Sequence, residues 1–186
     1  AMGTSTARHS AGAEELYNRG KAYGIVGVAV DGMNVLEVKD GNKIARVSPY
    51  DGTLISCVVE YPHQCIGKQS ISLLLNPKIY SSQISSARTF GFLKDIKYLR
   101  SIGLTLGGNL DNAIVLDENS ILNQEGLRFP DEFVRHKVLD FIGDISLAGN
   151  RIHGSFYSSH TGHQLNVKLV EKIFECSSNW ELISSN

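Results

Sequence analysis

Residues 35–60 read "VLEVKDGNKIARVSPYDGTLISCVVE", three short runs rich in β-branched residues that are separated by "KDG" and "PYDG". Runs of this length and composition, bounded by Gly, Pro and Asp, are typical of strands. Turns of this kind join neighbouring antiparallel strands. The stretch therefore predicts an antiparallel meander.

The segments that follow alternate less regularly. "SISLLL" at 70–75 predicts a further strand, and "NAIVLD" at 112–117 and "RIHGSFYSS" at 151–159 predict two more. Apolar residues at helical spacing predict helices at 77–87, 93–103, from Pro130 to Gly149, and 162–175. Strands, then helices, then strands favour an α+β fold over a doubly wound sheet. We expect a two-layer sandwich in which a mainly antiparallel sheet packs on helices.

Composition restricts the possible functions. The 186 residues, 42% of them hydrophobic, suffice for one ordinary domain or two small ones. With 18 basic and 19 acidic residues the formal charge is −1, which predicts no nucleic-acid partner. No apolar run reaches the roughly 20 residues of a membrane span, and the first residues lack the features of a signal peptide. Three cysteines without a C-x-x-C pair indicate reduced thiols. We expect a cytoplasmic protein without a transmembrane segment.

A polar stripe crosses the helix that contains "FVRHKVLDFIGD" at 133–144. His136, Asp140 and Asp144 are four residues apart, so they lie along one side of the helix. An imidazole and a carboxylate at this spacing can bind one divalent ion, and nitrogen and oxygen ligands suit catalytic zinc or iron. An ordinary surface pair of His136 and Asp140 has the same spacing, and spacing alone favours it.

Three other stretches change that balance. "SARTFGF" at 86–92, "LGGNLDNA" at 106–113 and "HTGHQLN" at 160–166 occur with the stripe in a particular order. Together with "PYDG", "DNAIVLDE" and "LNQEGLRFPDEFVRHKVLDFIGD", they closely resemble the zinc-dependent UDP-3-O-acyl-N-acetylglucosamine deacetylase family of lipid A biosynthesis. The resemblance covers about residues 35–175, which look like the second of the family's two domains. Residues 35–186 are therefore interpreted as a module like that second domain, and residues 1–34 as a leader, a tag scar or a first-domain remnant.

The resemblance implies a role for each matched residue. His136 and Asp140 would be two of the zinc ligands. His163 would stabilise the developing oxyanion and protonate the departing amine, and Asp144 would orient it. Thr89 would hydrogen-bond the tetrahedral intermediate. A metal lowers the pKa of bound water toward 7 and polarises the amide carbonyl, which makes hydrolysis near neutral pH feasible.

The resemblance also implies where the substrate binds. Lys137, Phe90, Phe92 and Gly108 would contact a nucleotide-sugar lipid, UDP-3-O-acyl-N-acetylglucosamine or a related molecule. Residues 108–128 look like a small strand-containing insert that forms a hydrophobic passage for the acyl chain.

One part of the family's site has no clear match. The first domain supplies a general-base glutamate and a third zinc ligand, a histidine, in an E-H-L sequence that this chain lacks. In "AEELYNRGKAYGI" at 13–25, Glu14 occupies the place of the base and Glu15 the place of the ligand, and a glutamate can bind zinc. Residues 13–25 therefore have two interpretations. Either the segment is unrelated or vestigial and the metal site is incomplete, or Glu15 completes the metal site.

Three interpretations follow. The chain is a shortened deacetylase with half of the site, or a relative that binds nucleotide-sugar, acyl chain or a protein without turnover. In the third interpretation it is a stand-alone enzyme whose metal site is completed by Glu15, by His9, or by a second copy of the chain. The expected partners therefore include a missing first domain or a second chain that completes the site.

Overall fold

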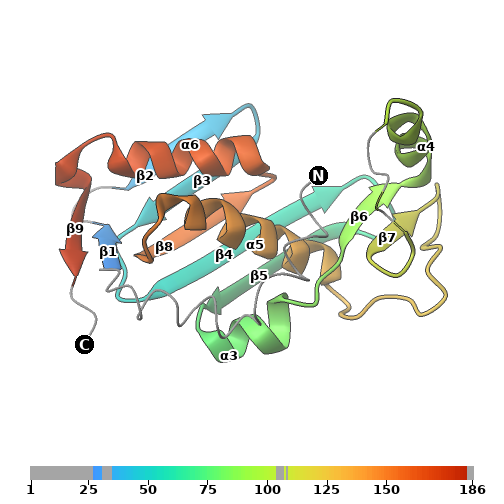
Figure 1. The fold of residues 1–186 in the computed structure, drawn as a ribbon, viewed down its shortest axis with the longest axis horizontal. Helices are drawn as coiled ribbons and strands as arrows, with labels where there is room; N and C mark the ends of the chain where they lie inside the picture. Colours follow the sequence, from blue (N-terminus) through green and yellow to red (C-terminus); the bar gives the residue numbers. More distant parts are fainter. Residues whose placement is uncertain (1–26, 31–34, 104–106, 108, 184–186) are drawn as a thin grey trace.

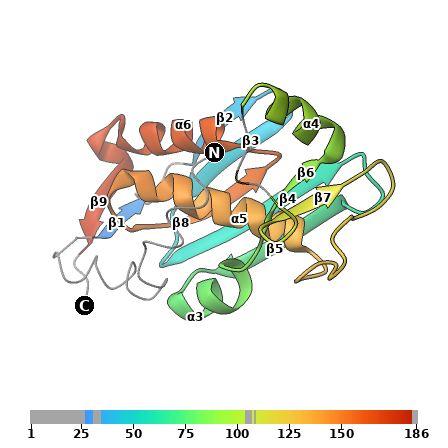
Figure 2. The same ribbon diagram turned by 45° about the vertical axis from the view of Figure 1, so that its right-hand side comes forward.

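The computed structural model describes residues 27–30, 35–103, 107 and 109–183. This part of the chain has an α+β fold, in which a mixed, mostly antiparallel sheet carries helices on one face (Figures 1 and 2). The predicted fold class is confirmed. The strands of the main sheet are β1 (Gly27–Val30), β2 (Leu36–Asp40), β3 (Lys43–Ser48), β4 (Thr53–Tyr61), β5 (Gly67–Leu74), β8 (Ile152–Ser159) and β9 (Trp180–Ile183).

Strand β8 is the centre of this sheet. On one side it pairs in parallel with β4, which in turn pairs with β5. On the other side it pairs antiparallel with β3, which forms a hairpin with β2. The beginning of β8 pairs in parallel with β1, which is N-terminal to the predicted module at 35–186, and β1 pairs with β9. The sheet therefore joins strands from both ends of the described chain.

The predicted meander of three neighbouring strands is wrong. β2 and β3 pair with each other, but β8 lies between β3 and β4. The segment "PYDG" therefore crosses over the end of β8 instead of forming a tight hairpin. Gly52 has a φ of 107°, and its carbonyl accepts a hydrogen bond of 2.7 Å from the N–H of Gly154. A turn signal shows that the chain changes direction, but it does not show that the two strands pair.

Gly154 in β8 allows this crossing because it has no side chain. A Cβ atom there would lie 2.7 Å from Cγ2 of Val47 and 3.3 Å from the carbonyl oxygen of Ser48. We expect Gly154→Ala to lower the free energy of unfolding by about 1–3 kcal/mol, the usual effect of overpacking. Gly143→Ala is the matched control, because nothing lies within 4 Å of its Cβ position and alanine favours a helix. Urea unfolding measures both, and equal stability of the two variants would contradict the prediction.

Two long helices, α5 (Glu132–Ile145) and α6 (His163–Phe174), lie side by side across one face of the sheet (Figures 1 and 2). α5 turns Val134, Val138 and Phe141 toward the core, where all three are fully buried. Its continuation as a 3-10 turn, η2 (Ser146–Ala148), stops at Gly149, whose φ of 71° is the left-handed conformation that ends helices. The short elements α3 (Pro77–Ile79), η1 (Tyr80–Ile84) and η3 (Ser177–Asn179) complete the helices of the main body.

The predicted insert at 108–128 belongs to a small unit beside this body, and below we call the whole unit the insert. β6 (Thr89–Phe92) and β7 (Ala113–Leu116) make a two-stranded parallel sheet, and α4 (Leu93–Ser101) follows β6 directly. In Figure 1 these elements lie at the end of the molecule opposite β1 and β9. A second apolar cluster joins the insert to the body through Ile114, Leu116, Ile66 and Phe133. The structure thus contains the predicted strand in the insert. Among the helices of the described ranges, none has the length and apolar character that a membrane span requires.

All three cysteines are free thiols, but their surroundings differ. Cys57 is 1% exposed, and burial raises its pKa to about 11. Cys176 is exposed, and hydrogen bonds with Ser178 lower its pKa. Because the thiolate is the reactive form, we expect iodoacetamide to modify Cys176 first and Cys57 only after unfolding. Peptide mass spectrometry with and without urea checks this order, and early labelling of Cys57 would contradict it.

Candidate functional site

The polar stripe of α5 lies at the boundary between the core and solvent. His136, Lys137 and Asp140 are partly buried, because the neighbouring positions of the helix pack against the sheet. The side chains of His136 and Asp140 are 13% and 17% exposed. Both groups are therefore held in a restricted environment, unlike an ordinary pair on an exposed helix face.

The imidazole of His136 faces the carboxylate of Asp140. Nε2 of His136 lies 3.4 Å from Oδ1 of Asp140. Nδ1 of the same ring lies 3.4 Å from the carbonyl oxygen of Ala87, which can only accept a hydrogen bond. A proton on Nδ1 leaves a lone pair on Nε2 that faces the carboxylate. A shared cation between Nε2 and Oδ1 satisfies both atoms, so this geometry suits two ligands of one metal ion.

Electrostatics keep His136 in the neutral form that binds metals. Burial is the main reason why the pKa of His136 lies below its usual 6.5. The carboxylate of Asp140 and the hydrogen bond with the Ala87 carbonyl oppose this shift, whereas the positive charge of Lys137 adds to it.

Lys137 connects the stripe to the insert. Its Nζ lies 2.9 Å from Oδ2 of Asp140, which leaves Oδ1 facing His136. The same ammonium group lies 5.6 Å from the centre of the Phe90 ring, and Phe90 packs edge-on against Phe133 with ring centres 5.0 Å apart. The ammonium group of Lys137 and the two candidate ligands thus form a polar surface, and the Phe90 ring forms an apolar surface next to it.

His163, the second histidine of the site, is on α6 and is held by a carboxylate of the neighbouring helix α5. Nδ1 of His163, at the start of α6, lies 2.9 and 3.0 Å from the two carboxylate oxygens of Asp144. Since a carboxylate accepts, Nδ1 donates, and Nε2 is left to exchange a proton with a ligand. Asn166 donates a 2.8 Å hydrogen bond from Nδ2 to Asp144, while its own Oδ1 has no partner in the described structure. The pairing of Asp144 with His163 agrees with what the resemblance implies.

The remaining predicted site residues fall into two groups. Thr89 is exposed at the start of β6, and Phe92 ends that strand with its ring 5.6 Å from that of His63. Glu14, Glu15, His9 and Gly108 lie outside the described residues. Among the residues that are described, no group of three His, Cys, Asp or Glu side chains could hold a metal ion. His136 and Asp140 are thus a pair without a third such side chain beside them in the described part of the chain.

Sequence reasoning missed three contributors. Asn166 lies three residues after His163 in "HQLN", so helical spacing could have indicated that both reach one partner. The carbonyl of Ala87 has no sequence signal. Arg88 and Glu132 form a buried ion pair. They are 44 residues apart in the sequence, so no local sequence pattern predicts the pair.

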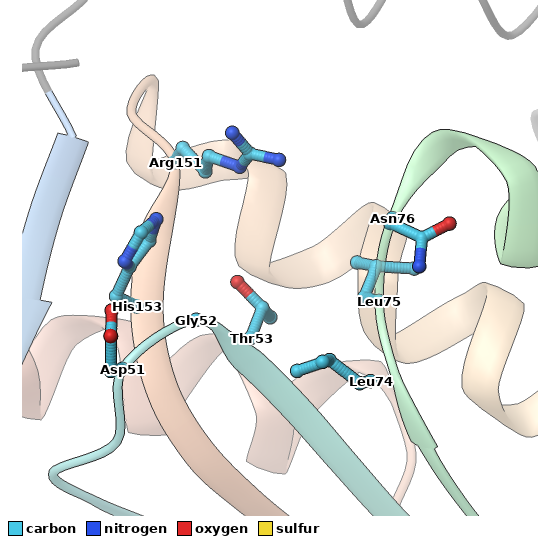
Figure 3. A pocket seen from close by; sticks show the side chains of 8 residues that line it. All are labelled: Asp51, Gly52, Thr53, Leu74, Leu75, Asn76, Arg151 and His153. Carbon is cyan, nitrogen blue, oxygen red and sulfur yellow. The ribbon is translucent and has the colours of Figure 1, made fainter. Parts of the chain in front are cut away.

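Two surface hollows lie at opposite ends of β4 and β8. One, of about 350 Å³, is next to His163, since it is lined by the three residues before it and by the end of β4. The other, of about 180 Å³, lies at the starts of the same strands (Figure 3). It contains none of the predicted site residues; its lining is Asp51, Gly52, Thr53, Leu74, Leu75, Asn76, Arg151 and His153.

Comparison with known families shows to which family the chain belongs. It belongs to the LpxC family, described as UDP-3-O-acyl N-acetylglycosamine deacetylase, whose model matches residues 11–175. The chain is 48% identical to the UDP-3-O-acyl-N-acetylglucosamine deacetylase of Campylobacter lari over 149 residues, 80% of this chain and 51% of the relative. It is also 48% identical to proteins of the same name from Nitratiruptor sp. (82% of this chain, 51% of the relative) and Histophilus somni (80% and 50%). The chain thus spans about half the length of the curated relatives it matches.

Proposed function

We propose that this chain carries half of the site of a zinc-dependent deacetylase that hydrolyses the acetamide of UDP-3-O-acyl-N-acetylglucosamine in lipid A biosynthesis. One observation carries the proposal: His136, Asp140 and Asp144 lie along one side of α5, and the carboxylate of Asp144 contacts His163 at the start of α6. The names of the relatives supply the substrate. Three free thiols agree with a reducing compartment, and we place the reaction in the cytoplasm.

The metal would be held by Nε2 of His136 and Oδ1 of Asp140. Zinc bound there would activate a water molecule and polarise the acetamide carbonyl. Lys137 occupies Oδ2 and thereby limits the carboxylate to one free oxygen. The further ligand and the general base would come from Glu15 and Glu14, or from the part of the relatives that this chain does not span.

His163 would carry the proton transfer. With Nδ1 bound to Asp144, its Nε2 is free to stabilise the developing oxyanion and to protonate the departing amine. Thr89, exposed on β6, would donate a hydrogen bond to the same oxygen. Lys137, Phe90, Phe92 and Gly108 would contact the nucleotide-sugar, and the insert at 108–128 would receive the acyl chain.

A second candidate function is binding without turnover. It is favoured by the lack of a third potential ligand near His136 and Asp140 in the described residues. In that case the site recognises a nucleotide-sugar lipid or a protein partner but does not hydrolyse the amide.

Acetate release from UDP-3-O-acyl-N-acetylglucosamine separates the two functions. The chain is assayed alone and mixed with the part of the Campylobacter lari relative that it does not span, produced as a separate polypeptide. Release by the chain or by the mixture, lost in Asp140→Ala, supports the deacetylase. Substrate binding without any release, with both polypeptides folded by circular dichroism, contradicts it and supports the binding function.

A further inference from the structure

The most deeply buried charges of the described chain lie beside the site. The side chain of Arg88 is 2% exposed and that of Glu132 is 0% exposed. Arg88 donates to Glu132 from Nε at 2.9 Å and from Nη2 at 3.1 Å. Glu132 also accepts hydrogen bonds from the backbone N–H of Arg88 at 2.9 Å and of Arg128 at 2.6 Å. The carboxylate is therefore satisfied by four donors.

Arg88 extends this cluster to the returning end of the insert. Its Nη1 lies 2.6 Å from Oε1 of Glu125, and its Nη2 donates to the carbonyl of Gly126 at 2.7 Å. One guanidinium group thus joins three segments: the first turn of α5, the residue before β6, and residues 125–128. We call this group of contacts the Arg88 clamp.

The clamp connects the two elements on which the candidate site stands. Glu132 is four residues before His136, so both lie on one face of α5. Arg88 lies between Ala87, whose carbonyl is next to the His136 ring, and Thr89. A shift of Arg88 along α5 would therefore move Thr89 relative to His136.

Besides the clamp, β6 is held by its pairing with β7 and by apolar packing. Hydrogen bonds from His63 and Gln64 to backbone carbonyls hold only the segment after β7. β6 pairs with β7 alone, in a sheet separate from the main one. A sheet of two strands is only marginally stable by itself. The packing of Phe90 against Phe133 and Tyr61 is apolar and not directional. The Arg88 clamp, in contrast, provides directional hydrogen bonds from the planar, rigid guanidinium group of Arg88.

We propose that Arg88 and Glu132 are positioning residues that set Thr89 against His136 and hold the insert beside the site. A buried ion pair is weak evidence for stability, because an apolar pair of similar size often stabilises a fold as well. The contribution of the pair of Arg88 and Glu132 is that it positions β6, a strand that does not belong to the main sheet. The catalytic consequence rests on the proposed function, in which Thr89 and His136 act on the same substrate.

Hydrogen exchange followed by mass spectrometry tests the placement without requiring activity. In Arg88→Met/Glu132→Gln we expect amides in 89–92 and 113–116 to exchange about tenfold faster or more, while those of β4 and β8 keep their protection. Arg88→Lys keeps the positive charge but loses the planar guanidinium group. It should therefore show the same faster exchange in 89–92 and 113–116, even if the double variant folds poorly. Unchanged protection in β6 and β7, or equal loss in β4 and β8, would overturn the proposal.

Arg135→Met is the matched control. Arg135 is a partly buried arginine of α5 that pairs with Asp131 at 2.6 Å and contacts Gln83 instead of β6. Protection of β6 and β7 should stay unchanged in this variant. The same local loss in the control would show that the clamp has no special role.

Steady-state kinetics tests the consequence for the reaction in a preparation that releases acetate. A displaced Thr89 should lower kcat about 100-fold with little change in KM, since small misplacement acts mainly on the reacting geometry. A rise in KM with unchanged kcat would refute the catalytic role. If the wild type releases no acetate, the proposed function fails, and the exchange experiment still decides whether Arg88 and Glu132 position β6.

Discussion

His136→Ala is expected to lower kcat/KM for acetate release by about 1,000-fold. A catalytic metal supplies several kcal/mol of barrier reduction, and each 1.4 kcal/mol corresponds to a factor of ten. The variant loses Nε2, one of the two atoms that converge on the proposed metal position, and it leaves Asp140 facing an empty space. We also expect the variant to retain less zinc than the wild type after dialysis. Acetate assays and metal analysis measure both effects.

His153→Ala is the control for this prediction. His153 is a partly buried histidine of β8 that lines the hollow at the opposite end of the strands from His163 (Figure 3). Its replacement should leave turnover and zinc content unchanged, with folding checked by thermal unfolding. The account is contradicted if His136→Ala keeps wild-type turnover and zinc, or if both histidine variants lose them equally.

Glu132→Gln is expected to lower the free energy of unfolding at pH 7 by about 3–5 kcal/mol. Removing one partner of a buried ion pair leaves the other charge uncompensated, here the guanidinium of Arg88. Urea unfolding measures the loss. Glu125→Gln is the control, because Glu125 bonds to the same guanidinium but is 56% exposed, so its loss should be much smaller. Equal losses in the two variants would contradict the prediction.

This effect should depend on pH. Burial by itself raises the pKa of Glu132, but hydrogen bonds from Arg88 and from the N–H of Arg128 outweigh burial and hold the pKa below the usual 4.5. A carboxylate with a depressed pKa in the folded state stabilises the fold above its unfolded pKa, and this contribution is lost as the pH falls through the folded pKa. The stability difference between wild type and Glu132→Gln should therefore be constant from neutral pH to about 4.5 and shrink below it. A difference that grows on acidification would contradict this sign.

The fold could be predicted where the signal is local. The helices α5 and α6, the hairpin of β2 and β3 and the strand in the insert all follow from periodicity and turn residues within a few positions. The place of β8 between β3 and β4 could not, because its partners are about 100 residues away in sequence. The strands β1, β6 and β9, each four residues long, were missed.

The candidate site could also be predicted only in part. Helical spacing placed His136, Asp140 and Asp144 along one side of α5, but it could not distinguish a metal pair from a surface pair. The partner of Asp144 came from the resemblance alone, because His163 is on another helix. Spacing could not show that Nδ1 of His136 faces the carbonyl of Ala87, and this contact is what directs Nε2 toward Asp140.

The anomalous scattering of zinc in crystals of the protein grown with zinc tests the central claim most directly. The account predicts a peak about 2.0–2.2 Å from Nε2 of His136 and from a carboxylate oxygen of Asp140, which disappears in His136→Ala. A zinc peak on other residues, with no density between His136 and Asp140, would contradict it.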